Sequence, residues 1–172
     1  MGCDRSWPRV EELDVCSAIG RSVAWIVVSL LLLTGASAGG HTLIATDADH
    51  VAIQGYDTVA YFTDGDAVMG SDRFEYAWDG AKWRFASAAH RKLFIADPDR
   101  YMPRFGGNCA GAMMDGLLVP ANPKAWAIVD GKLYMVAGDA RDIDEWKADA
   151  AANIKKANQK WPEAQHQAAE SQ

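Results

Sequence analysis

Alternation of hydrophobic and polar residues marks two short stretches of the chain, and each predicts a β-hairpin. In the first, the alternating segments 73–78 and 82–85 flank Asp79-Gly80. The second repeats this order over 125–136, around Asp130-Gly131. Asp-Gly between alternating segments is a strong hairpin signal, because both central residues of a type I′ turn need a positive φ.

Capping residues and helical periodicity predict the helices. Ser87 is a good N-cap with His90 at N3, and the helix that it starts is expected to end at Asp97-Pro98. A longer helix begins after Asp139, where apolar residues recur at three- and four-residue steps. We expect Pro162 to end this helix, because proline removes a backbone donor and clashes with the preceding turn.

Together these elements predict an α+β domain. We expect one small antiparallel sheet built from the two hairpins, with short helices and a long C-terminal helix packed on it. Around the domain, which spans 51–161, the sequence predicts a flexible lead-in over 39–50 and a disordered tail over 162–172.

The first 38 residues have the features of a cleaved signal peptide. An apolar run over 23–33 follows Arg21 and precedes Ala36-Ser37-Ala38, a small-residue cleavage site. The run is shorter than the ~18–20 residues that a membrane-spanning helix needs. We therefore predict a periplasmic or secreted protein without a transmembrane span after cleavage. The alternative is an uncleaved N-terminal anchor that leaves the domain in the same compartment.

Composition excludes several classes of protein. The chain has 172 residues, a hydrophobic share of 49% and a net charge of −6, which favour one globular domain and argue against a nucleic-acid partner. The sequence contains no phosphate-binding loop, Gly-x-Ser-x-Gly elbow, HExxH motif or paired-cysteine zinc spacing. A hydrolase or nucleotide enzyme is therefore not indicated.

The candidate chemistry centres on Cys109, the one cysteine that remains after removal of the leader. It follows Gly106-Gly107, which lets the backbone turn, and it stands at the start of a predicted short helix. Met113, one turn later, faces the same side. Thiolate and thioether are soft ligands suited to Cu(I). The alternative is a buried cysteine with core-filling methionines.

Two histidines extend this hypothesis. A chain reversal between His90 and Cys109 would bring the two together, although His90 also fits as a solvated capping residue. Cleavage after Ala38 would create the N-terminus Gly-Gly-His41, whose amine, amides and imidazole can wrap a square-planar Cu(II) or Ni(II) ion. We count both histidines as candidate metal ligands.

Three segments carry a family resemblance: residues 52–62 (AIQGYDTVAYF), 85–101 with its Phe-Ala-Ser start and Asp-Pro pair, and 105–110 (FGGNCA). Over about 51–161 the chain resembles the exported, stand-alone branch of the YHS-domain proteins. The resemblance implies a small α+β module related to YHS modules in which paired cysteines bind heavy metal. This chain has Ala86 and His90 in place of that cysteine pair, so the resemblance points to Cys109 of the Gly-Gly-x-Cys-Ala pattern.

The sequence thus predicts an exported, non-enzymatic module that binds a transition metal, copper, through Cys109 with His90 or Met113. One alternative is a thiol enzyme in which Cys109 is the nucleophile and His90 the base. The other is a purely structural or interaction domain. The expected partner is accordingly a transition-metal ion or a protein.

Overall fold

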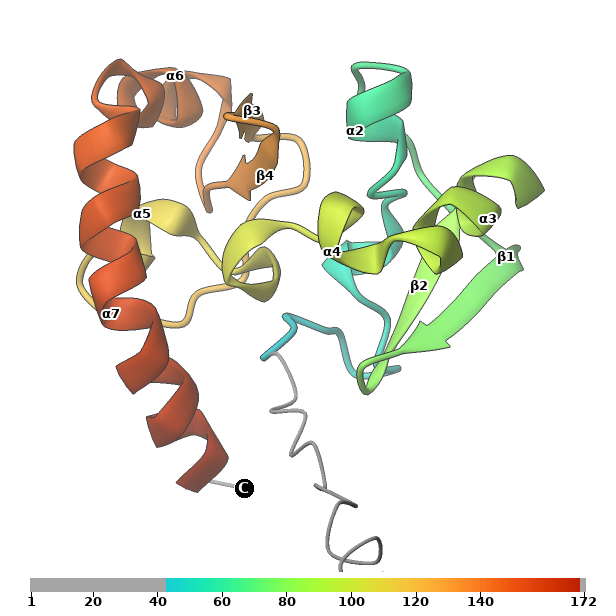
Figure 1. Ribbon diagram of the computed structural model, residues 1–172, viewed down its shortest axis with the longest axis horizontal. Helices are drawn as coiled ribbons and strands as arrows, with labels where there is room; N and C mark the ends of the chain where they lie inside the picture. The colour runs from blue at the N-terminus through green and yellow to red at the C-terminus, as the bar shows by residue number, and fades with distance from the viewer. Residues whose placement is uncertain (1–42, 171–172) are drawn as a thin grey trace, which may run out of the picture. The chain divides into compact units, whose positions relative to one another are not determined.

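The computed structural model describes residues 43–170, and within this range the chain forms an α+β domain (Figure 1). The elements are, in order, η1 (Ile53–Gly55), α2 (Ala60–Thr63), β1 (Ser71–Trp78), β2 (Ala81–Phe85), α3 (Ala88–Ala96), α4 (Pro98–Tyr101), η2 (Arg104–Gly107), α5 (Ala110–Met113), β3 (Trp126–Val129), β4 (Lys132–Met135), α6 (Ala140–Ala148) and α7 (Ala150–Glu170).

Both predicted hairpins are confirmed. Strand β1 pairs antiparallel with β2, and β3 pairs antiparallel with β4. At the first turn Asp79 and Gly80 have φ values of 48° and 77°. At the second, Asp130 and Gly131 have φ values of 49° and 68°. These positive values are the reason why Asp-Gly stands at both tips.

The hairpins do not join into the single sheet that we expected. Within residues 43–170 each forms its own two-stranded sheet. The free edge of β2 is taken by the N-terminal segment, since Ala52 N–H donates to the carbonyl of Lys82 at 2.9 Å and Lys82 N–H donates to that of His50 at 2.8 Å. The second hairpin therefore cannot extend the first sheet at this point.

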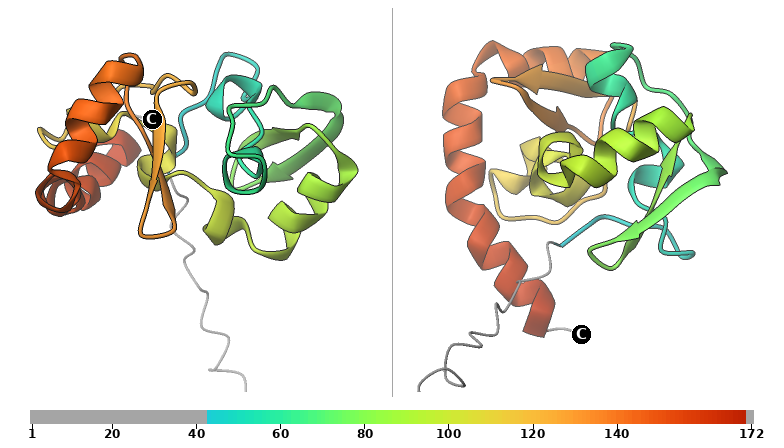
Figure 2. Two further views of the ribbon diagram at one scale, coloured as in Figure 1. Left: turned by 90° about the horizontal axis from the view of Figure 1, so that it is seen from above. Right: turned by 45° about the vertical axis from the view of Figure 1, so that its right-hand side comes forward.

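Two groups of buried side chains form the core, and strand β4 contributes to both. The first surrounds Trp83, Phe85 and Phe94, where α3 covers the β1–β2 hairpin. The second contains Cys109, Met113 and Trp146 and lies among α5, the β3–β4 hairpin, α6 and α7 (Figure 2). Helices α3 and α5 thus belong to different parts of the core.

The predicted caps at Ser87 and Asp139 are confirmed. Ser87 Oγ accepts from the N–H of His90 at 3.1 Å and starts α3, and Asp97 both ends α3 and caps α4, with Pro98 in its first turn. Asp139 starts α6 and forms a reciprocal capping box with Asp142. Local side-chain chemistry therefore fixes where these helices begin.

The C-terminal part differs from expectation in two ways. The periodic segment divides at Asp149 into α6 and α7. Helix α7 then continues through Pro162 to Glu170, so residues 162–170 are helical rather than a disordered tail. Pro162 lies on the exposed side of the helix, where water can satisfy the carbonyl that proline leaves unpaired. Burial of Ala157 and Ala164 holds the helix on both sides of it.

The N-terminal segment also differs from the expected flexible lead-in. Over 43–50, Ala45 N–H donates to the carbonyl of Gly106 at 2.8 Å, and Ile53 N–H donates to that of Ala45 at 3.3 Å. The segment is thereby tied to the loop that precedes Cys109. Residues 39–42, like the predicted signal peptide, lie outside the described residues. Within 43–170 no helix combines the length and apolar character needed to cross a bilayer.

Candidate functional site

Two adjacent glycines bring the chain to Cys109, and both are required by close packing. Gly106 has φ 62°, and a Cβ there would overlap the carbonyl of Leu43. Gly107 has φ 82°, and a Cβ there would overlap the side chain of Ile53. The glycine pair therefore lets the backbone of the N-terminal segment and the side chain of Ile53 pack directly against this loop, where a Cβ would collide with them.

Cys109 is the N-cap of α5, and 6% of the residue is exposed. Its Sγ accepts a backbone N–H from Ala112 at 3.4 Å and another from Ala137 at 3.2 Å. Ala137 follows β4, so the second bond ties the hairpin to α5. N–H donors aimed at sulfur stabilise negative charge on it. The arrangement suits either a bound thiolate or a structural cap.

Met113 is fully buried one turn after Cys109 and belongs to the same group of core side chains. Its backbone N–H donates to the carbonyl of Cys109 at 2.9 Å. Gly111, between them, is partly exposed, and a Cβ there would lie 3.6 Å from the Cys109 sulfur. The structure thus brings the predicted thiol and thioether into one cluster, with a glycine over the sulfur.

His90 has a different set of neighbours. Its Nδ1 lies 2.7 Å from Oδ2 of Asp57, a carboxylate with no exposed surface. On the other side of the ring, Nε2 lies 3.3 Å from Oγ1 of Thr63 and 3.8 Å from Oδ1 of Asp64. The imidazole is therefore held from within by one carboxylate and faces another at the surface.

Asp57 is the residue that the sequence reasoning missed. Besides His90, it accepts the backbone N–H groups of Val59 at 2.9 Å, Ala60 at 3.4 Å and Ala86 at 2.7 Å. The carboxylate thus joins the start of α2, the end of β2 and α3. The position of Asp57, after Gly55-Tyr56 and before the apolar run of α2, is a local sign of a helix cap. No local sign in the sequence indicates its contact with His90.

The structure does not bring His90 to Cys109. His90 lies on α3 in the first part of the core and Cys109 at α5 in the second, and Figures 1 and 2 show these helices well apart. The reversal between them instead places η2 and α4 in the intervening space. His90 and Cys109 therefore do not form a thiol–imidazole pair. Across residues 43–170 no three His, Cys, Asp or Glu side chains are grouped to hold a metal. His41 lies outside the described residues.

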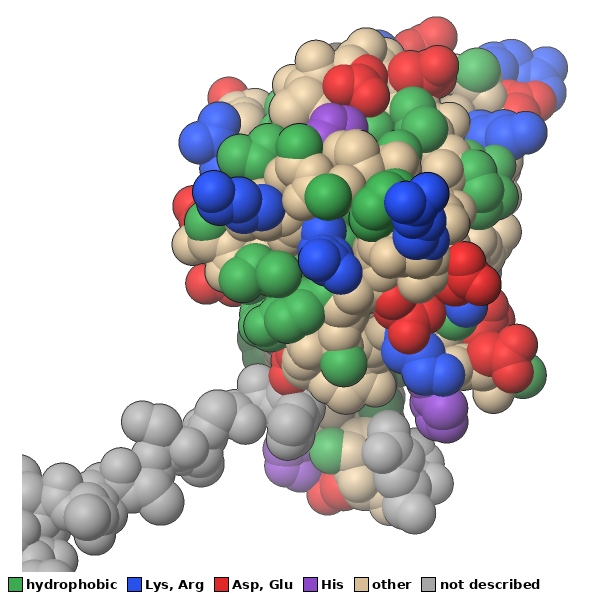
Figure 3. Space-filling model, turned by 90° about the vertical axis from the view of Figure 1, so that its right-hand side faces the viewer, with side chains coloured by type: hydrophobic (Ala, Val, Ile, Leu, Met, Phe, Trp, Pro, Cys, Tyr) green, Lys and Arg blue, Asp and Glu red, His purple; other side chains and the backbone are tan. Residues whose placement is uncertain are grey.

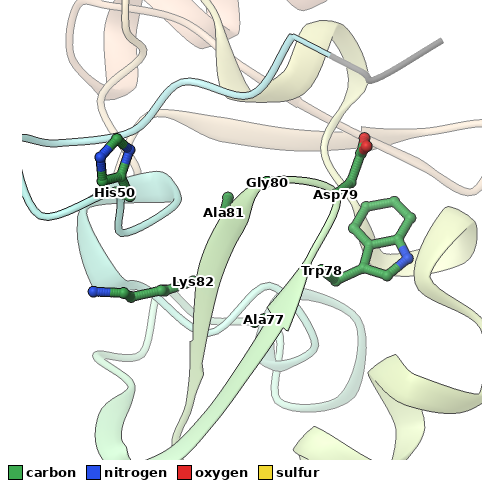
Figure 4. Close-up of a pocket in the computed structure, with 7 residues that line it drawn as sticks. All are labelled: His50, Ala77, Trp78, Asp79, Gly80, Ala81 and Lys82. Carbon is green, nitrogen blue, oxygen red and sulfur yellow. The ribbon is translucent and has the colours of Figure 1, made fainter.

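A hollow of about 510 Å³ opens at the tip of the first hairpin. It is lined by His50 and by residues 77–82. In Figure 4, His50 and Lys82 lie to one side of the hairpin and the Trp78 indole points away to the other. None of the predicted site residues lines this hollow, and we assign no chemistry to it.

The chain was compared with models of known protein families, with curated proteins and with solved structures, and no match was found in any of the three.

Proposed function

We propose that the chain is an exported, non-enzymatic module that binds Cu(I) through the Cys109 thiolate, with Met113 as the second soft ligand. The supporting observation is that Sγ of Cys109 accepts backbone N–H groups from both Ala112 and Ala137. Two such donors compensate the charge of a thiolate that is removed from water.

Copper(I) suits this position for two reasons. It prefers thiolate and thioether sulfur, and a buried cluster with Cys109 and Met113 offers both. It also tolerates few ligands, which matters because His90 is held elsewhere by Asp57. The partly exposed Gly111 covers the sulfur without a side chain, so a small local opening of α5 would admit the ion.

The test is an anaerobic Cu(I) titration of the purified protein against a chromophoric competitor. We expect Cys109→Ser to abolish tight binding and Met113→Leu to weaken it, while the matched control Met69→Leu, at an exposed methionine, leaves it unchanged. The proposal is refuted when Cys109→Ser binds Cu(I) as well as the unaltered protein does.

A purely structural role for Cys109 is the second candidate, and the same hydrogen bonds favour it, because they tie β4 to α5. Serine can accept the same bonds, whereas valine cannot. A structural cysteine predicts near-normal stability for Cys109→Ser, a clear loss for Cys109→Val and no copper binding in any form. The thiol-enzyme alternative has no comparable support, since among residues 43–170 the predicted base, His90, is bound to Asp57 and not to the sulfur.

Export to the periplasm or medium is part of the proposal and rests on the predicted signal peptide. The proposed kinship with the YHS-domain proteins rests on the three quoted segments. Sequencing the N-terminus of the protein recovered from its native compartment tests export. A start at Gly39 would support it and would also create the Gly-Gly-His41 terminus. A start upstream of the apolar run would favour the anchored alternative.

A further inference from the structure

We propose that His90 and Asp64 form a second, surface site for a divalent transition-metal ion, with Asp57 as the residue that orients the imidazole. The site is independent of Cys109 and uses nitrogen and oxygen, which suit Zn(II) or Cu(II) rather than Cu(I).

The first support is the way in which Asp57 holds the ring. The carboxylate is completely buried and accepts backbone N–H groups at both oxygens, so its position is fixed by α2 and β2. Because an ionised carboxylate can only accept, the proton at the 2.7 Å contact belongs to Nδ1 of His90. Carboxylates that hold one imidazole nitrogen in this way are the usual support behind a metal-bound histidine. The other nitrogen, Nε2, is left to bind.

The second support is what Nε2 faces. The Thr63 hydroxyl lies within 3.2 Å of the Val59 carbonyl, to which it can donate its proton, and this turns its oxygen lone pairs toward His90. Nε2 then points at two electron-rich oxygens, Oγ1 of Thr63 at 3.3 Å and Oδ1 of Asp64 at 3.8 Å. A metal ion bound by Nε2 and by Oδ1 of Asp64 would join these electron-rich atoms, and it competes with a proton on Nε2 and with a hydrogen bond donated to Nε2 by the Thr63 hydroxyl.

The spacing fits a metal after a small movement. Zinc–nitrogen and zinc–oxygen distances of about 2.0–2.2 Å at a tetrahedral angle put the two ligand atoms about 3.3–3.5 Å apart. Asp64 follows α2, and its side chain is 44% exposed, so it is free to close from 3.8 Å. Figure 3, which shows the face with α2 and α3, has both acidic and Lys or Arg side chains along its upper edge, so the cation would be held by His90 and Asp64 themselves rather than by a uniformly acidic surface. Water would fill the remaining coordination positions.

The test is a Zn(II) titration of the purified protein followed by the ring-nitrogen resonances of its four histidines, which separates His90 from His41, His50 and His166. We expect the Nε2 resonance of His90 to shift on binding while Nδ1 keeps its proton. Asp64→Asn should weaken binding at least tenfold without loss of fold, because Asp64 is exposed. Asp66→Asn is the matched control, an exposed aspartate of the same loop with no contact to His90, and should leave the affinity unchanged.

The variant Asp57→Asn tests whether Asp57 orients the imidazole. It should lower the zinc affinity about 10–100-fold and should alter the Nδ1 resonance of His90 before any zinc is added. The proposal fails if zinc leaves the His90 resonances unmoved at millimolar concentration, which would mean that a proton alone occupies the site. It also fails if Asp64→Asn binds zinc normally. Cys109→Ser should not affect zinc affinity, so loss of Cu(I) binding and loss of zinc binding refute different proposals.

Discussion

Replacing Gly106 by alanine should destabilise the protein far more than the same change at a glycine with open space around it. At Gly106 the backbone has φ 62°, and the added Cβ would overlap the Leu43 carbonyl. Gly65 has φ 68°, and a Cβ there meets nothing within 4 Å. The two sites share the same backbone strain, and only Gly106 adds a collision. The difference between the two losses of stability therefore measures how much the crossing N-terminal segment contributes to the free energy of unfolding.

The magnitude follows from what the collision breaks. Left-handed backbone costs an alanine about 1–2 kcal/mol at either position. At Gly106 the displaced segment also loses the 2.8 Å hydrogen bond from Ala45 N–H to the Gly106 carbonyl, a loss of about 1 kcal/mol. Partial exposure of Ile44, which packs against the first part of the core, adds about 1 kcal/mol. We therefore expect Gly106→Ala to cost about 3–4 kcal/mol and Gly65→Ala about 1–2 kcal/mol.

Urea unfolding of both variants beside the unaltered protein provides the measurement. The entropy that alanine removes from the unfolded chain is the same at the two positions and cancels in the comparison. Equal losses of stability for Gly106→Ala and Gly65→Ala would refute the reasoning, because they would mean that the segment over 43–46 contributes nothing to the folded state.

Three further outcomes are expected. Asp57→Ala should lower the free energy of unfolding by about 3–5 kcal/mol, since four donors lose a buried carboxylate; a loss below 1 kcal/mol in urea unfolding would contradict this. Burial raises the pKa of Tyr61, and Tyr56 and Asp57 add to the shift. The folded state therefore holds its proton where the unfolded state releases it, and stability should fall above about pH 10; Tyr61→Phe should flatten that fall in pH-dependent unfolding. Pro162→Ala should stabilise the protein by up to about 3 kcal/mol, because α7 continues through this position; an unchanged thermal midpoint would mean that the last turns contribute nothing.

The parts of the fold that could be predicted are those whose signals lie within a few residues. Asp79-Gly80 sets the first hairpin because its turn needs two positive φ values, and the flanking alternation supplies both strands. Ser87 and Asp139 likewise cap their helices through bonds that reach no further than three residues. Each of these features depends on residues that are close in sequence and not on contacts with distant parts of the chain.

The features that could not be predicted depend on residues far apart in the sequence. The expected turn at Gly106 is confirmed by its positive φ, but the sequence did not indicate that a side chain is also excluded there because Leu43 crosses it. The strand edge that would have joined the two hairpins is occupied by 50–52, which carries no strand signal of its own. Pro162 is a strong local sign of a helix end, yet burial of Ala164 beyond it outweighs that sign.

The same limit applies to the candidate site. Cys109 and Met113 share one turn of helix, so their spacing could be interpreted locally and the structure places them in one cluster. His90 and Cys109 are separated by α4 and η2, and nothing in their own sequence sets the direction in which these elements turn the chain. The partner that His90 does find, Asp57, precedes it by a whole hairpin.

This outcome changes what the glycine pair says about Cys109. In the sequence, two glycines before a solitary cysteine suggested a loop shaped to present sulfur to a ligand. The structure gives the glycines a packing reason of their own, so they no longer count as evidence for a reactive or metal-bound thiol. What remains is the pair of N–H donors from Ala112 and Ala137. A serine at 109 would keep that pair while removing the soft ligand. Two measurements therefore distinguish the two roles of the sulfur. Loss of copper affinity in Cys109→Ser indicates a metal ligand, whereas loss of stability in Cys109→Val without copper binding in any form indicates a cysteine that only links β4 to α5 by hydrogen bonds.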